Sequence, residues 1–201
     1  MKAMSVISLK TSILTRDIKT IGMSNNNQKI PYCAVGLCNP KSPGNVGSVM
    51  RACGCFAADH IFYTGIRFNR AERFYTDTTK NRNRIPLQQV DDLTQALAND
   101  IQVVCVELCE NAVALAEFNH PDRACYLFGP EDGSLSQQLI NAADHVVFIP
   151  THGCLNMAAS VNVVLYDRAM KRAPRLNASQ YNEMVRSNRD CRNNLKAGAD
   201  K

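Results

Sequence analysis

From Pro31 onward, short apolar runs alternate with segments of helical periodicity, and this alternation limits the folds open to the chain. Each apolar run is only a few residues long and is rich in Val, Ile, Leu or aromatic side chains, which favours buried strands. Buried strands separated by helices are typical of a mainly parallel sheet that is covered on both faces. We therefore expect an α/β fold, with a mainly parallel sheet and helices on both of its faces.

The patterns also give approximate boundaries. We expect strands at Tyr32–Leu37, His60–Tyr63, 101–108, 124–128 and 146–149, and helices at 45–57, 90–98, 111–118, 135–142 and 156–171. Residues 31–173 then form one domain. Residues 1–30 form an N-terminal extension, and residues 174–201, which are rich in Arg and Asn, form a basic polar tail or a loosely attached helix.

The composition is that of an ordinary globular protein and leaves the partner open. Hydrophobic residues make up 45% of the 201 residues and charged residues 20%, which is sufficient for one full-sized core. The net charge of +5 is compatible with a polyanionic partner such as nucleic acid, although many proteins with neutral substrates carry as much.

The nine cysteines favour a reducing compartment and argue against a metal centre. No two of them form the C-x-x-C pair that zinc sites normally use. Cys53 and Cys55 fall on different faces of an expected helix, and Cys105 lies within an apolar strand. We therefore expect buried, reduced thiols in a cytoplasmic protein without a bound metal. No apolar stretch approaches the ~20 residues of a membrane span, so we expect no membrane association.

Three separated, glycine-bearing loops point to a composite ligand site. The loops at 39–45, 128–133 and 149–156 each follow an expected strand and lead into an expected helix. In an open α/β sheet, ligands bind outside the carboxyl ends of the strands, where such loops gather. Small residues let a cofactor approach the backbone, while the Asn, Arg and Glu side chains in and beside the loops supply polar chemistry.

The helix after the first loop has two distinct faces. One face is an apolar stripe at helical spacing, made of Val46, Val49, Met50, Cys53 and Phe56. The other carries Gly47, Arg51, Gly54 and Ala58, where glycine permits close packing of another backbone and Arg51 is the one cation. The helix start, preceded by Gly44 and Asn45, is also a natural phosphate site, and a solvated surface arginine on a plain helix is the alternative.

The second and third loops carry further candidates. Glu131 lies at the mouth of the turn that Gly129 begins, whereas Asp132 or Ser134 is expected to cap the following helix. The segment 156–166 is apolar nearly all round and predicts a buried helix, in which Asn156 and Asn162 must find hydrogen-bond partners. His152 has no paired base or nucleophile in its motif, so we interpret it as a solvated loop histidine.

These residues, in this order, resemble the SpoU (TrmH-like) branch of the SPOUT superfamily of RNA methyltransferases over residues 31–172. The resemblance implies a SPOUT-type domain with a C-terminal trefoil knot, acting as a homodimer whose active site draws on both subunits. It also implies transfer of a methyl group from S-adenosylmethionine to a ribose 2′-hydroxyl of tRNA or rRNA. Knots are nearly absent from proteins in general, so the knot rests on the resemblance alone.

Matched motif by motif, the resemblance implies roles for single residues. Asn45 and Arg51 match the first motif, with Arg51 as its catalytic arginine, and Glu131 and Asn156 match the second and third. The positions whose backbone holds the cofactor are matched by Gly129, Ile149 and Leu155, with Leu108 as a looser candidate. Cys154 stands where the family commonly has Ser, and a thiol donates hydrogen bonds more weakly than a hydroxyl.

The expected RNA surface is a basic connection whose cations would make salt-dependent phosphate contacts. They are Arg67, Arg70, Arg73, Lys80, Arg82 and Arg84. A solvated basic face without RNA fits the same pattern. Two other functions keep the fold: a catalytically silent RNA-binding dimer, and an enzyme that methylates a base instead of a ribose. A nucleotide-cofactor dehydrogenase is disfavoured, because no G-x-G-x-x-G follows the first strand.

Overall fold

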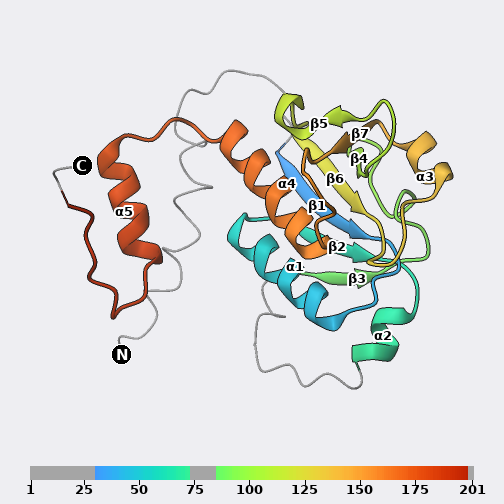
Figure 1. The fold of residues 1–201 in the computed structure, drawn as a ribbon, viewed down its shortest axis with the longest axis horizontal. Coiled ribbons are helices and arrows are strands. Elements are labelled where there is room, and N and C mark those ends of the chain that lie inside the picture. Colours follow the sequence, from blue (N-terminus) through green and yellow to red (C-terminus); the bar gives the residue numbers. More distant parts are fainter. Residues whose placement is uncertain (1–29, 73–84, 199–201) are drawn as a thin grey trace. The chain divides into compact units, whose positions relative to one another are not determined.

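The computed structural model describes residues 30–72 and 85–198, and within them strands and helices alternate (Figure 1). The strands are β1 (Tyr32–Leu37), β2 (His60–Tyr63), β3 (Leu87–Gln89), β4 (Gln102–Val106), β5 (Val113–Ala114), β6 (Arg123–Phe128) and β7 (His145–Phe148). The helices are α1 (Pro43–Cys55), α2 (Arg67–Glu72), a 3-10 turn η3 (Leu115–Glu117), α3 (Gln137–Ala142), α4 (Met157–Arg172) and α5 (Ala178–Asn188).

The seven strands form one sheet in the order β3-β2-β1-β6-β4-β7-β5, and every pair is parallel. The predicted parallel α/β fold is confirmed. The chain leaves β1 toward β2 on one side, and β6 later inserts on its other side, between β1 and β4. Such a reversal of strand order opens a crevice at the carboxyl ends, where α/β proteins bind ligands. The ends of β1, β6, β4 and β7 therefore frame the candidate site.

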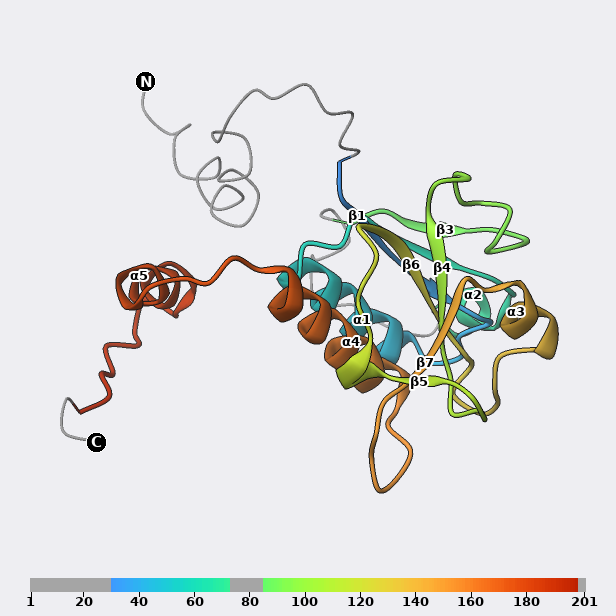
Figure 2. The same ribbon diagram turned by 90° about the horizontal axis from the view of Figure 1, so that it is seen from above.

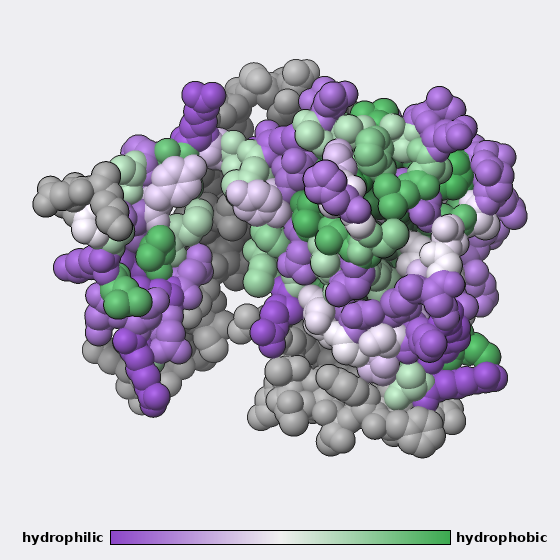
Figure 3. All heavy atoms as spheres, viewed as in Figure 1, coloured by the Kyte–Doolittle hydropathy of each residue, from purple (hydrophilic) through white to green (hydrophobic). Residues whose placement is uncertain are grey.

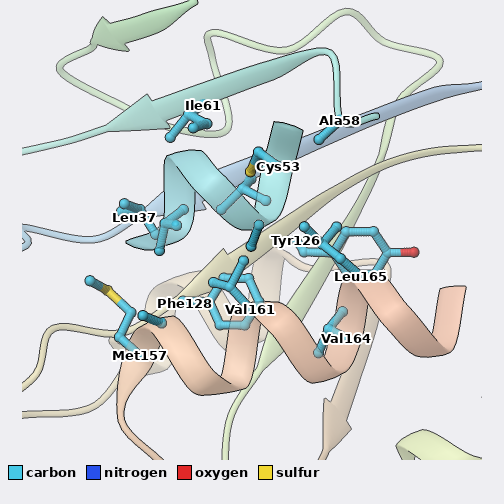
Figure 4. Close-up of a cluster of buried hydrophobic side chains, with 14 of the residues drawn as sticks. Leu37, Cys53, Ala58, Ile61, Tyr126, Phe128, Met157, Val161, Val164 and Leu165 are labelled. Atoms are coloured by element: carbon cyan, nitrogen blue, oxygen red, sulfur yellow. The ribbon is translucent and has the colours of Figure 1, made fainter. Parts of the chain in front are cut away.

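Each face of the sheet carries its own core, because successive strand residues point to opposite sides. Helices α1 and α4 cover one face, where Leu37, Tyr126 and Phe128 pack against Val161 and other α4 residues (Figure 4). On the opposite face, buried strand residues pack against α3 and the irregular segment 90–101. The apolar stripe predicted for α1 is confirmed, since Val46, Val49, Met50 and Cys53 are buried and Phe56 packs against the same cluster.

A buried polar network ties the C-terminal half of α4 to the segment before β6. His120 contacts the Tyr126 hydroxyl through Nδ1 at 2.7 Å and the Asp167 carboxylate through Nε2 at 2.8 Å. The Arg168 guanidinium, only 7% exposed, donates to the Tyr126 hydroxyl and to backbone carbonyls. Those carbonyls belong to Tyr32, Pro121 and Asp122. Burial lowers the pKa of His120, although the Asp167 carboxylate opposes this, so the neutral imidazole is favoured.

The structure differs from the predicted elements in several segments. Residues 90–98 form turns instead of a helix, because the Asp92 carboxylate accepts from the amides of Thr94 and Gln95 and closes a local turn. β3 is not among the predicted strands, since Leu87–Gln89 is short and two of its three residues are exposed. The helix predicted within 111–118 is instead β5 followed by the 3-10 turn.

The chain divides into two compact units, one spanning Lys29–Ala173 and the other including the segment from Pro174. In that segment α5 starts at a capping box, in which Asn177 and Gln180 bond each other's backbone amides. No helix among the described residues is long and apolar enough to cross a membrane. The trefoil knot and the domain boundaries stay predictions.

Candidate functional site

The first and second loops meet through the Glu131 carboxylate. One of its oxygens accepts from the Lys41 amide at 2.8 Å. The other accepts from the Ser42 amide at 2.9 Å and from the Asn45 side-chain amide at 3.2 Å. Asn45 and Glu131, 86 residues apart in sequence, are thereby brought together at the start of α1.

This contact corrects the phosphate site predicted at the start of α1. Ser42 is the N-cap, and its hydroxyl accepts from the Asn45 amide, while the amides of Lys41 and Ser42 already bind Glu131. The anion at this helix N-terminus is thus supplied by the protein itself. Burial alone would raise the pKa of Glu131, but the donors at Ser42, Lys41 and Asn45 outweigh it and hold that pKa below its ordinary value.

Asp132 links the second loop to α2 instead of capping a helix. Its carboxylate binds the Arg67 guanidinium through two bonds of 2.9 and 2.8 Å and lies 3.7 Å from the Lys41 ammonium. The helix cap is Ser136, whose hydroxyl accepts from the Leu139 amide, so the predicted caps Asp132 and Ser134 are wrong. The sequence offered no signal for Asp132 as a partner of Arg67, because the two meet only through the tertiary fold.

The cofactor candidates are two exposed leucines, a glycine with little free space, and Ile149. Leu108, just beyond β4, is 60% exposed, and Leu155, in the loop after β7, is 41% exposed. Figure 2 shows that this last loop projects away from the sheet, and residues 150–156 are all exposed. At Gly129, an added Cβ would lie 3.2 Å from the Leu135 amide nitrogen, so a side chain there would crowd the base of the loop. Ile149 is half-buried and packs against the α1–α4 core.

Asn156 and Asn162 correct the prediction of a helix buried all round. Asn156 is exposed and caps α4, accepting from the Ala159 amide at 2.7 Å, and exposed Asn162 donates to the Ala158 carbonyl. Beside Asn156, Met157 packs in the same core cluster as Leu37 and Phe128, the last residues of β1 and β6 (Figure 4). Asn156 therefore stands at the carboxyl edge of the sheet with the other motifs.

Arg51 is the candidate catalytic residue that does not lie with the others within a single protomer. It is exposed on α1, about 9 Å along the helix axis from Asn45, and shares its face with exposed Gly47 and Gly54. Neither glycine has a heavy atom within 4 Å of the place where a Cβ would sit, so the backbone there is open. Ala58 does not continue this face, because α1 ends at Cys55 and Ala58 is buried in the core.

The remaining candidates are placed as follows. Arg70 is exposed on α2, and His152 is exposed in the loop after β7, as predicted. Arg73, Lys80, Arg82 and Arg84 lie outside the described residues.

Four of the nine cysteines, Cys55, Cys109, Cys154 and Cys191, are exposed, so the prediction of buried thiols is wrong for them. Within residues 30–72 and 85–198, no three His, Cys, Asp or Glu side chains form a metal-binding group.

A protein-family model matches the part of the chain that contains this site. The model of the SpoU rRNA Methylase family matches residues 32–166, from β1 into α4. The chain belongs to this family. The match includes all three loops, and it confirms the family resemblance inferred from their motifs.

Two curated relatives extend the comparison at low identity. A tRNA (guanosine(18)-2′-O)-methyltransferase of Aquifex aeolicus is 21% identical over 141 residues, which are 67% of each chain. A tRNA/rRNA methyltransferase of Mycobacterium leprae that is named as uncharacterized is 27% identical over 150 residues, which are 71% of this chain and 48% of the relative.

Solved structures share the SpoU fold. The TrmH/SpoU tRNA modifying enzyme of A. aeolicus superposes with a TM-score of 0.61 at 19% identity, covering 77% of this chain and 86% of that one. The SpoU methyltransferase AviRb of Streptomyces viridochromogenes, in complex with AdoMet, gives 0.58 at 22% identity, covering 74% and 62%.

Proposed function

We propose that this SpoU-family protein is an RNA methyltransferase that transfers a methyl group from S-adenosylmethionine to a ribose 2′-hydroxyl of tRNA or rRNA. The observation that carries the proposal is the meeting of the family's motifs at the carboxyl edge of the sheet. Glu131 joins the first and second motifs through Asn45, and Asn156 begins the helix of the third motif beside the ends of β1 and β6.

The residues at this edge fit the cofactor. S-adenosylmethionine supplies a methyl group that its sulfonium makes electrophilic. Leu108 and Leu155 expose apolar side chains of a kind that suits a planar base, and together with Ile149 they would line the cofactor site. At Gly129 an added Cβ would crowd the Leu135 amide nitrogen at 3.2 Å, so glycine keeps this loop closed where its backbone would hold the cofactor.

The protein must also activate a poorly acidic hydroxyl, and we assign this to Arg51. A guanidinium has a pKa above ~12 and is a poor base. Arg51 instead grips a neighbouring phosphate and stabilises the negative charge that develops on the 2′-oxygen. The new O–CH₃ bond forms as the S–CH₃ bond breaks, and the hydroxyl proton leaves to phosphate or water.

RNA contacts Arg51 and Asn45 at the site and the basic surface of α2 beyond it. Arg67 and Arg70 belong to this surface, and Arg73 follows directly in the sequence. Arg67 is held by Asp132, so an RNA phosphate must share or replace that carboxylate.

All nine cysteines are free, which fits a protein of the reducing cytoplasm, where we place it.

The active unit is a homodimer that pairs through the exposed face of α1 and α4. Val163, Tyr166 and Met170 on α4 are 37%, 56% and 53% exposed, which is unusual for apolar side chains on one helix. The Tyr166 ring packs edge-on against Phe56 just beyond α1, so the exposed apolar face of α4 reaches the C-terminal end of α1. Pairing here brings Arg51 to a junction between two protomers.

The test is incubation of the protein with labelled S-adenosylmethionine and separate tRNA and rRNA pools, followed by digestion to nucleosides. Label on ribose is the expected result, label on a base favours the base-methylating alternative, and no transfer favours a silent RNA-binding dimer. Arg51→Ala should abolish transfer with cofactor affinity intact, and Arg51→Lys should rescue little, because lysine lacks the planar fork. Ser48→Ala, one turn earlier on α1, is the control that keeps activity.

A further inference from the structure

Glu107, which belongs to none of the three motifs, lies at the centre of the carboxyl edge. It directly follows β4, and its backbone amide donates to the Val147 carbonyl at 2.9 Å, which extends the pairing of β4 with β7. The residue is half-buried. Burial raises the pKa of the Cys38 thiol, at the end of β1, to about 11, and the negative charge of Glu107 adds to this rise. The carboxylate therefore sits among the ends of β1, β4 and β7.

The two oxygens of this carboxylate hold two separate pieces of backbone. One oxygen accepts from the Leu135 amide at 2.8 Å, and the other accepts from the Leu108 amide at 3.0 Å. Leu135 ends the second loop, and its side chain is buried in the core beneath α3. Leu108 is the exposed apolar residue of the proposed cofactor site. One side chain thus fixes both the strand end that carries Leu108 and the far end of the second loop.

The second loop closes on itself at the same point. A Cβ added at Gly129 would meet the Leu135 nitrogen at 3.2 Å and the Glu107 carboxylate oxygen at 3.5 Å. Gly129, where the loop leaves the sheet, and Leu135, where it returns, therefore lie close together at the base of the loop. A Glu107 carboxylate oxygen lies beside both of them. Farther along the loop, Glu131 and Asp132 bind the first loop and α2. Glu107 provides the remaining anchor, on the side that faces β4.

We propose that Glu107 is a positioning residue for the methyl donor: it holds the backbones at Leu108 and at the base of the second loop in the shape that receives the cofactor. The inference rests on the proposed function, because it assumes that these backbones bind S-adenosylmethionine. Hydrogen bonds from amides to a carboxylate are about twice as strong as those between neutral groups. Without the carboxylate, the amide of the buried Leu135 loses its acceptor, and the base of the second loop can open.

Two substitutions separate charge from shape. Glu107→Ala removes both acceptors. Glu107→Gln keeps the shape and one acceptor oxygen, but it turns an NH₂ group toward the other backbone amide. The Kd for the demethylated product S-adenosylhomocysteine should rise about tenfold to a hundredfold in Glu107→Ala and less in Glu107→Gln. The Kd for RNA should stay unchanged in both, because Glu107 lies outside the proposed RNA contacts on α1, α2 and the C-terminal segment.

The experiment is calorimetric titration of the full chain with S-adenosylhomocysteine, combined with hydrogen exchange at the Leu108 and Leu135 amides. Exchange should accelerate at both amides in Glu107→Ala, with partial recovery in Glu107→Gln. Glu110→Ala removes an exposed carboxylate three residues further on and is the matched control. A wild-type Kd in both Glu107 variants overturns the proposal. Wild-type protein that binds no S-adenosylhomocysteine would instead refute the proposed function, and Glu107→Gln keeps the test open if Glu107→Ala fails to fold.

Discussion

At the scale of single residues, the Glu131 carboxylate contributes to stability in a pH-dependent way. Its pKa is depressed from the ordinary value of 4.5, because two backbone amides and the Asn45 amide favour the charged form over the cost of burial. A carboxyl group with a depressed folded-state pKa stabilises the fold above its unfolded-state pKa, and this contribution disappears as the pH falls through the folded-state value.

Glu131→Gln should therefore lower the free energy of unfolding at pH 7 by about 1 kcal/mol, a modest value because the group is only partly buried. The deficit should shrink once the pH falls below 4.5, as the wild-type carboxylate becomes protonated. Urea denaturation at a series of pH values measures it. Glu117→Gln, at an exposed glutamate in η3, is the control that should show no such trend. A deficit that stays constant down to pH 3 would contradict the assignment.

Single residues also mark how far sequence reasoning reaches. The pairing of Asn45 with Glu131 is predictable only as membership in one site, since 86 residues separate them and the fold alone brings them together. The apolar helix after Asn156 predicts burial for this residue, yet it is an exposed cap. The N-cap signal of Asn156 is local, and in a reading of the sequence the apolar periodicity of the following helix outweighs it. Glu107 carries no local signal at all, because one of the amides it binds comes from a loop 28 residues away.

At the scale of elements, periodicity identifies the buried strands and misses the two short strands β3 and β5, which have no buried residue. β1 and β2 match their predicted bounds, and the remaining predicted strands differ by a few residues at their ends. β3 forms because β2 offers it a parallel edge, and that cause lies outside its own three residues. In 90–98, Leu93 is buried at helical spacing from Leu97, but the Asp92 turn stops the backbone from continuing as a helix.

The element most dependent on one side chain is α4, which Arg168 fastens to the sheet. The guanidinium satisfies three backbone carbonyls and the Tyr126 hydroxyl in a buried setting. Arg168→Met keeps the aliphatic stem but leaves these acceptors unpaired, so it should lower the free energy of unfolding by about 3 kcal/mol. Urea denaturation measures the loss. Arg186→Met on exposed α5 is the control, expected within about 0.5 kcal/mol of wild type, and equal losses in both variants would argue against this role.

At the scale of the whole molecule, the exposed apolar face of α4 predicts the oligomeric state. Tyr166→Glu places a charge in the proposed pairing surface, so it should convert a dimer into monomers in sedimentation or light-scattering measurements. Tyr181→Glu is a matched control, because this tyrosine on α5 is 53% exposed against 56% for Tyr166. If the protein is monomeric, or Tyr166→Glu stays dimeric, pairing through this face is wrong.

The net charge of the molecule is divided unevenly along the chain. Residues 30–173 contain 12 of the 23 Lys and Arg but 14 of the 18 Asp and Glu, so the family domain by itself is slightly acidic. Arg168, Lys171 and Arg172 are moreover bound to backbone carbonyls within the fold. The positive balance of +5 therefore comes from the flanking segments. From Pro174 onward there are six basic and three acidic residues, on a segment whose α5 surface is mainly hydrophilic (Figure 3).

This division predicts that the C-terminal segment supplies much of the affinity for RNA, while the family domain supplies the chemistry. Replacing Arg186, Arg189 and Arg192 by Gln in the full chain should weaken tRNA binding and flatten its dependence on salt. The slope of log K against log salt should fall by about 0.7 to 0.9 for each phosphate that the variant no longer neutralises. Because the proposed cofactor site lies in the other unit, the Kd for S-adenosylhomocysteine should not change. The double variant Glu183→Gln with Asp190→Asn removes two negative charges from the same segment and should strengthen tRNA binding. An identical salt slope in the wild type and both variants would assign the RNA contacts to the family domain alone.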